Sequence, residues 1–112
     1  MKNLLGFGGG LIAAATLATV AIAQSPAIDG KKAKALFEGH ECAGCHQMEM
    51  KLVGPGLKQV ADKYRGDKGA ETRLLEKVKM GGVGVWGQIP MPPNAGIADE
   101  ELKIVIVWIL SL

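Results

Sequence analysis

The chain has 112 residues, of which 13 are basic and 11 are acidic, so its formal net charge is +2. This near balance, without a block of like charges, argues against nucleic acid as a partner, because nucleic-acid binding favours a clustered basic face. The length allows one small domain with a modest core, and such domains usually need a covalent or metal staple.

Residues 1–23 have the pattern of a secretory signal peptide. Lys2 supplies the positive start, an apolar stretch follows, and Ala21-Ile22-Ala23 is a small-residue cleavage pattern. We expect cleavage after Ala23 and a mature periplasmic domain of residues 24–112, which is 112 minus 23, or 89 residues, with a charge of +1 once Lys2 is lost. The alternative is an uncleaved membrane anchor, because the apolar stretch approaches spanning length.

The segment Cys42-Ala43-Gly44-Cys45-His46 contains both cysteines of the chain. Two cysteines spaced C-x-x-C and followed directly by histidine are the attachment signature of c-type haem. Each thiol adds to a vinyl group, and a three-residue separation places the sulfurs about one helical turn apart. The sequence therefore predicts one covalently attached haem c, with His46 held against one face of the porphyrin.

Three other uses of these cysteines are less consistent with the sequence. A thioredoxin-like site needs a βαβ setting, whereas the flanks here are helical or irregular. A zinc site would have to recruit His40, and ligands confined to residues 40–46 could hardly surround a tetrahedral ion. A disulfide between Cys42 and Cys45 would close a small, strained loop.

Spacing of apolar residues predicts an all-α domain with about four helices and no internal boundary. The first helix covers about residues 29–38 with Asp29 as its N-cap, and others cover 57–64 and 70–80. Residues 81–96 are expected to be irregular, since they include five glycines and three prolines. Residues 99–110 are ambiguous because their β-branched content also suits a strand, but the acidic residues at 99–101 favour a helix N-terminus.

The iron also needs a sixth ligand, or an open position that would make the protein reactive. Met1 leaves with the signal peptide, and Met48 and Met50 lie too close to His46 to reach the opposite face. Met80 ends an amphipathic helix, where methionine more often fills gaps in the core. Met91 lies between prolines that restrict φ and stiffen its loop, so it is the better candidate.

These residues resemble the short, single-haem bacterial class I cytochromes c, of the c-551 type, over the whole mature region. The matching segments are Leu36-Phe37, the Cys42–His46 motif, Val53-Gly54-Pro55, Val60-Ala61-Asp62-Lys63-Tyr64, Gly84-Val85-Trp86-Gly87, Pro90-Met91-Pro92-Pro93-Asn94 and Trp108-Ile109-Leu110-Ser111. The resemblance implies a class I cytochrome c fold, in which about four helices wrap around one covalently bound haem.

The resemblance also implies roles for individual residues. His46 and Met91 would be the axial ligands, and Cys42 and Cys45 the thioether links. Four further residues would contact or orient the haem and its ligands. The Pro55 carbonyl would accept the Nδ1 proton of His46, Trp86 would donate to a haem propionate, and Asn94 would orient the Met91 sulfur. Lys77 stands where well-known members have an arginine near a propionate. The lysine ammonium lacks the planar, two-pronged guanidinium group of arginine, so it cannot make the same contact with a propionate.

The function that the resemblance implies is that of a periplasmic electron carrier, not an enzyme, cycling between Fe(III) and Fe(II). Expected partners are redox proteins that dock transiently: a quinol-linked cytochrome complex or a dehydrogenase upstream, and a reductase or an oxidase downstream. We expect a monomer that binds neither nucleic acid nor, once the signal is cleaved, a membrane. The alternatives are a haem subunit of a larger oxidoreductase, or a haem enzyme or gas sensor with an open sixth site. His40 is expected to be exposed to solvent and to have no contact with the iron.

Overall fold

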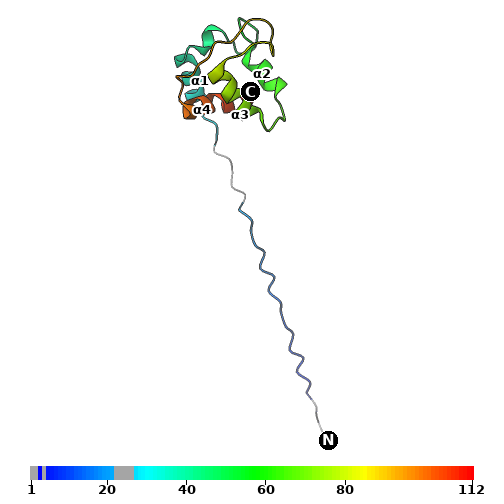
Figure 1. Ribbon diagram of the computed structural model, residues 1–112. Helices are drawn as coiled ribbons and strands as arrows, with labels where there is room; N and C mark the ends of the chain where they lie inside the picture. The colour runs from blue at the N-terminus through cyan, green and yellow to red at the C-terminus, as the bar shows by residue number, and fades with distance from the viewer. Residues whose placement is uncertain (1–2, 4, 22–26) are drawn as a thin grey trace.

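The computed structural model describes residue 3, residues 5–21 and residues 27–112. Residues 5–21 contain no helix or strand and run away from the helical part of the molecule (Figure 1). The expected cleavage point after Ala23 lies outside the described residues. Among the residues that are described, no helix is both long enough and apolar enough to cross a membrane.

The described chain forms four α-helices and one short 3₁₀ helix, which confirms the all-α prediction. They are α1 (Gly30–Gly39), η1 (Cys42–Gly44), α2 (Leu57–Lys63), α3 (Ala70–Met80) and α4 (Asp99–Leu110). The observed ends lie within one residue of the predicted ones. At the start of α1, the Asp29 carboxylate accepts a hydrogen bond from the Lys32 amide at 3.0 Å, which satisfies a backbone donor that the helix itself leaves free.

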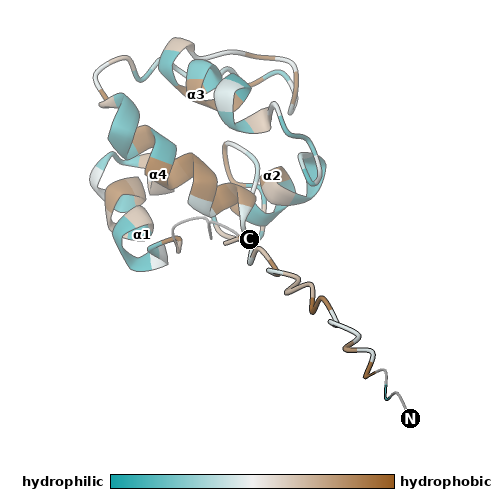
Figure 2. Ribbon diagram, turned by 90° about the horizontal axis from the view of Figure 1, so that it is seen from below, coloured by the Kyte–Doolittle hydropathy of each residue, from teal (hydrophilic) through white to brown (hydrophobic). Residues whose placement is uncertain are grey.

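Helix α4 is the central element, because it packs against α1, α2 and α3. The ambiguous segment near the C-terminus is thus a helix and not a strand, with acidic residues in its first turn at 99–101. These carboxylates lie at the positive end of the helix dipole, which stabilises the helical form of a β-branched sequence. Figure 2 shows α4 as the most continuously hydrophobic ribbon, between α1 and α3.

The core is divided into two clusters that both use α4. One joins α1 to the C-terminal half of α4, where the rings of Phe37 and Trp108 meet edge to face with centroids 6.0 Å apart. The other joins Ile97 to Leu102 and Ile106 of α4, with the apolar side chains of α3 packed against them. Because the clusters share one helix, α4 holds α1 and α3 on either side of the space between them.

Segments without regular structure also border this space, among them residues 45–56 and 81–96. Residues 81–96 are irregular as predicted, apart from an antiparallel bridge between Gly82 and Met91. Between α1 and η1 the chain turns at Glu41, the one non-glycine residue with positive φ (62°) among those described. This left-handed conformation is unfavourable for an L-residue, and here it reverses the chain directly before Cys42.

Candidate haem-binding site

A cavity of about 360 Å³ opens between the two core clusters. Its wall is mostly apolar and includes side chains from all four helices and from the 81–96 loop. All eight residues that the sequence predicted for the site line this one cavity: Cys42, Cys45, His46, Pro55, Lys77, Trp86, Met91 and Asn94. The fold therefore brings together residues that are up to 52 positions apart in the sequence, from Cys42 to Asn94.

On one side of the cavity the His46 ring is fixed by a hydrogen bond. Its Nδ1 lies 2.8 Å from the Pro55 carbonyl oxygen. Because a carbonyl oxygen can only accept, Nδ1 must carry the proton, and Nε2 keeps a free lone pair for a metal. Such a partner also fixes the ring orientation and makes the imidazole a stronger ligand.

The ring of His46 also packs directly on the backbone of Gly54. A Cβ atom at position 54 would lie only 2.5 Å from His46 Cε1, closer than real contacts allow. Glycine therefore lets the chain pass over the ring and present the Pro55 carbonyl. In the sequence, Gly54 is notable only as part of the Val53-Gly54-Pro55 segment, and nothing there indicates this close contact.

The two thiols are presented by the short helix η1. The backbone amides of Cys45 and His46 both donate to the Cys42 carbonyl, at 3.1 and 3.0 Å. This tight turn puts both sulfurs on the cavity side, and both cysteines are free thiols. Burial raises the pKa of the Cys42 thiol above its usual value, and the neighbouring Cys45 acts in the same direction.

Met91, in the second half of the 81–96 loop, is held through its backbone. Its amide donates to the Gly82 carbonyl at 2.8 Å, and its carbonyl accepts from the Gly82 amide at 3.0 Å. Met91 is half-buried and lines the cavity, whereas Met80 is 78% exposed and is absent from the cavity wall. Of the two methionines left open by the sequence, only Met91 is therefore placed to face a group in the cavity.

Asn94 ties this loop to the end of α3. Its side-chain amide donates to the carbonyl oxygens of Pro92 at 3.0 Å and Val78 at 3.3 Å, and its backbone amide also donates to Val78 at 3.0 Å. The amide hydrogens are thus used on backbone oxygens. Asn94 thereby fixes the backbone next to Met91.

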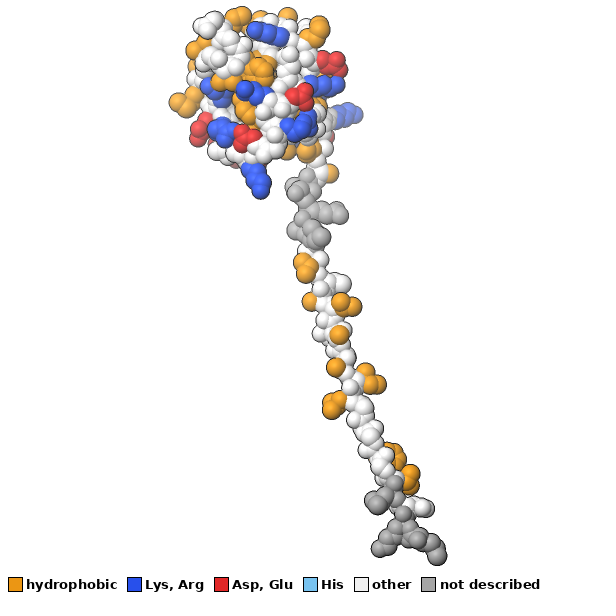
Figure 3. Space-filling model, turned by 90° about the vertical axis from the view of Figure 1, so that its right-hand side faces the viewer, with side chains coloured by type: hydrophobic (Ala, Val, Ile, Leu, Met, Phe, Trp, Pro, Cys, Tyr) orange, Lys and Arg blue, Asp and Glu red, His pale blue; other side chains and the backbone are white. Residues whose placement is uncertain are grey.

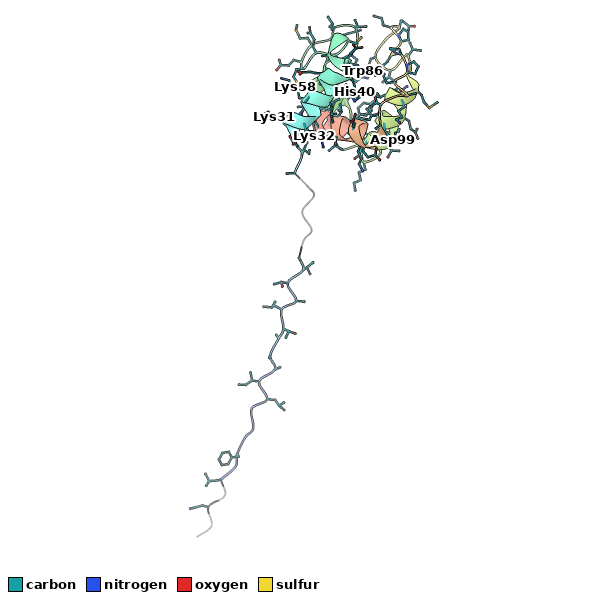
Figure 4. All side chains as sticks on the ribbon, turned by 90° about the vertical axis from the view of Figure 1, so that its left-hand side faces the viewer. Lys31, Lys32, His40, Lys58, Trp86 and Asp99 are labelled. Carbon is teal, nitrogen blue, oxygen red and sulfur yellow. The ribbon has the colours of Figure 1, made fainter. Side chains whose placement is uncertain are left out.

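Trp86 and Lys77 bring polar hydrogens to the same wall of the cavity. Trp86 is 37% exposed and lies on the exposed part of the 81–96 loop, at the end of the domain away from the N-terminal segment (Figure 4). Lys77, from the last turn of α3, packs over Gly82, since a Cβ there would lie 2.6 Å from the Lys77 Nζ. Both side chains can therefore serve anionic groups at the edge of a bound molecule.

His40 differs from the expectation of a solvent-exposed residue. Its side chain is only 30% exposed, and its Nε2 lies 2.7 Å from the Glu101 Oε2 in the first turn of α4. This contact holds the imidazole within the protein, where α1 ends beside α4. No sequence pattern indicates this contact, because the two residues are 61 positions apart.

These residues fit a haem, on the chemistry of the groups present. Two free thiols, an imidazole with an available Nε2 and a thioether line an apolar cavity that also offers an indole N–H and an ammonium. The zinc arrangement is not formed, since no group of three His, Cys, Asp or Glu side chains converges among the residues described.

Comparison with known proteins agrees with this assignment. The family model for cytochrome c matches residues 30–112. The chain is 45% identical to cytochrome c-552 of Nitrosomonas europaea over 103 residues, which are 92% of this chain and 93% of that protein. It is 54% identical to cytochrome c-551 of Allochromatium vinosum over 71 residues, covering 63% and 76% of the two chains.

Solved structures show the same relationship. The crystal structure of Nitrosomonas europaea cytochrome c552 superposes with a TM-score of 0.68 and 48% identity, covering 70% of this chain and 98% of that one. The fold predicted from the sequence, that of a class I cytochrome c, is thereby confirmed. The chain belongs to the cytochrome c family, and its cofactor is one covalently attached haem c.

Proposed function

We propose that the protein is a periplasmic carrier of single electrons, with His46 and Met91 as the two axial ligands of the haem iron. The observation that carries this proposal is that Met91, fixed by paired hydrogen bonds to Gly82, lines the same cavity as His46. When bound, the haem supplies a one-electron couple between Fe(III) and Fe(II). No group for substrate chemistry is required.

The protein's own residues set the properties of this couple. His46, with Nδ1 bonded to the Pro55 carbonyl, is a strong and rigid nitrogen ligand. A thioether opposite it raises the reduction potential, as does an apolar pocket that disfavours the extra charge of the ferric state. Both ligand-bearing segments are held by backbone hydrogen bonds, so little rearrangement accompanies electron transfer.

Partners would meet the protein at the exposed edge of the porphyrin near the thioether links. Cys45 is exposed at this point, whereas Cys42 is partly covered. Basic and acidic side chains are interspersed on the face of the molecule shown in Figure 3, without a field of one sign. A small surface of this kind suits brief encounters with redox proteins, namely respiratory donors on one side and a reductase or oxidase on the other. We propose that the carrier acts as a monomer.

An optical and redox titration of the purified protein tests the proposal. We expect a low-spin spectrum, the far-red ferric band of an iron–sulfur bond to methionine, and a clearly positive reduction potential. High-spin iron that binds added cyanide or carbon monoxide at once would reject the ligand pair and favour a reactive haem. Mass spectrometry of the mature protein tests the attachment and the cleavage after Ala23 together, because each changes the mass by a known amount.

A further inference from the structure

Trp86 lies in a part of the 81–96 loop that its own backbone holds only weakly. Every residue from 83 to 90 is exposed. The paired hydrogen bonds between Gly82 and Met91 fix the base of this segment, and within it the Gly84 amide donates to the Gly87 carbonyl at 2.9 Å. Both of these glycines have positive φ, at 105° and 122°. The backbone of the loop therefore leaves room for a contact from outside the loop to position the indole.

Lys63 supplies such a contact. It is the last residue of α2, and its Nζ lies 5.5 Å from the centroid of the Trp86 ring. The same ammonium lies 5.9 Å from the centroid of the Tyr64 ring. An ammonium within about 6 Å of an aromatic face is attracted by the ring quadrupole, most strongly for tryptophan. A cation is also favoured at the C-terminal end of a helix, so α2 helps to keep the ammonium in place.

This contact joins two parts of the cavity wall that are distant in sequence. Tyr64 and Trp86 both line the cavity, one next to α2 and the other on the loop. Lys63 itself is exposed and is not part of that wall. It can therefore affect the haem site only through its charge or through the aromatic rings that it touches.

We propose that Lys63 is a positioning residue that holds the Trp86 indole at the cavity wall. This rests on the proposed function, in which the indole N–H serves a haem propionate. Without the Lys63 ammonium the loop keeps only its backbone hydrogen bonds at the base and between Gly84 and Gly87, the indole N–H spends less time on the propionate, and the negative charge near the iron is less well compensated. The reduction potential then falls, since uncompensated negative charge favours the ferric state.

A double-mutant cycle separates positioning from simple charge removal. Lys63→Met is expected to lower the reduction potential of the holoprotein, and Lys63→Arg, which keeps a cation, to leave it near the original value. In a Trp86→Leu background, the shift caused by Lys63→Met should fall to less than about half. An equal shift in both backgrounds would overturn the proposal, because Lys63 would then act as a distant charge. Lys68→Met, which removes one exposed charge outside the cavity wall, is the control and should change the potential less.

A second readout does not require Trp86→Leu to bind haem. In the reduced, nitrogen-15-labelled holoprotein, Lys63→Met should move the Trp86 indole N–H resonance and speed its exchange with water, while the Trp108 indole stays unchanged. If the Trp86 indole N–H resonance does not move in Lys63→Met, and its exchange with water is no faster, the proposal is wrong. A wild-type spectrum without the iron–sulfur band would contradict the ligand assignment instead, and the indole readout would still decide the role of Lys63.

Discussion

At the scale of single residues, Gly54 has the tightest requirement in the site. We predict that Gly54→Ala displaces the His46 ring, because the new Cβ would lie 2.5 Å from its Cε1. A displaced ring is expected to lengthen or lose its hydrogen bond to the Pro55 carbonyl, which would weaken the proposed nitrogen ligand. Low-temperature electron paramagnetic resonance should show a new high-spin or altered low-spin population, together with a lower yield of holoprotein.

The matched control for this change is Gly44→Ala. A Cβ at position 44 meets nothing within 4 Å, although the residue lies in the haem-attachment segment. Its spectrum should therefore match the wild type. If both alanine variants gave wild-type spectra and yields, the close contact between Gly54 and His46 would not be needed for haem binding.

Met91 offers the second residue-scale prediction. Met91→Ala should remove the far-red ferric band, allow cyanide to bind rapidly, and lower the reduction potential sharply, since the proposed soft ligand, which favours the ferrous state, is lost. Spectroscopy and potentiometry of the holoprotein measure all three effects. Met80→Ala is the control, because Met80 is 78% exposed and absent from the cavity wall. If Met80→Ala lost the far-red band and Met91→Ala kept it, Met80 and not Met91 would be the sulfur ligand.

At the scale of elements, the end of α1 and the start of α4 are joined by a contact between two side chains, His40 and Glu101. His40 is the C-cap residue of α1, and Glu101 lies in the first turn of α4. The Glu101 carboxylate lies at the positive end of the α4 dipole, where a negative charge is favourable, and it also meets the His40 ring at the end of α1. The 2.7 Å contact therefore stabilises the crossing of the two helices as well as the helices themselves.

We predict that Glu101→Gln lowers the free energy of unfolding by about 0.5 to 1 kcal/mol, because both the pairing and the dipole interaction are weakened. Guanidinium unfolding followed by circular dichroism measures this change. Glu100→Gln is the control in the same turn, with a loss of about 0.3 kcal/mol from the dipole alone. Equal losses in the two variants would show that the contact with His40 adds nothing.

Much of the element order could be predicted because local signals agreed with the final packing. The N-cap at Asp29 and the acidic start of α4 were visible as residue types at fixed positions. The left-handed turn at Glu41 was not visible, since glutamate is an unusual residue for that conformation. Cation–π contacts such as that of Lys63 and close approaches such as Gly54 on His46 depend on how loops fold back, which no periodicity in the sequence encodes.

At the scale of the whole molecule, the core is not continuous. One cluster joins α1 to α4, the other joins α3 to α4, and the site cavity lies between their apolar walls. Only eleven hydrophobic residues are buried among those described, and even the larger side chains in this set retain some exposure. A domain of this size buries a smaller fraction of its chain surface than a large domain does, so a large apolar group bound between the clusters contributes a major share of the folding free energy.

We therefore predict that the fold depends on haem attachment. A chain with both Cys42→Ala and Cys45→Ala, purified free of haem, should lose most of its helical circular dichroism and unfold without a cooperative transition. The physical reason is that the apolar walls of the cavity would face water, while the conformational entropy cost of ordering the chain would remain. Single variants Cys42→Ala and Cys45→Ala, which each keep one thioether link, are the controls and should retain helicity with a lower melting temperature. A cooperative transition of the haem-free double variant near that of the holoprotein would show that the two clusters and α4 are sufficient on their own.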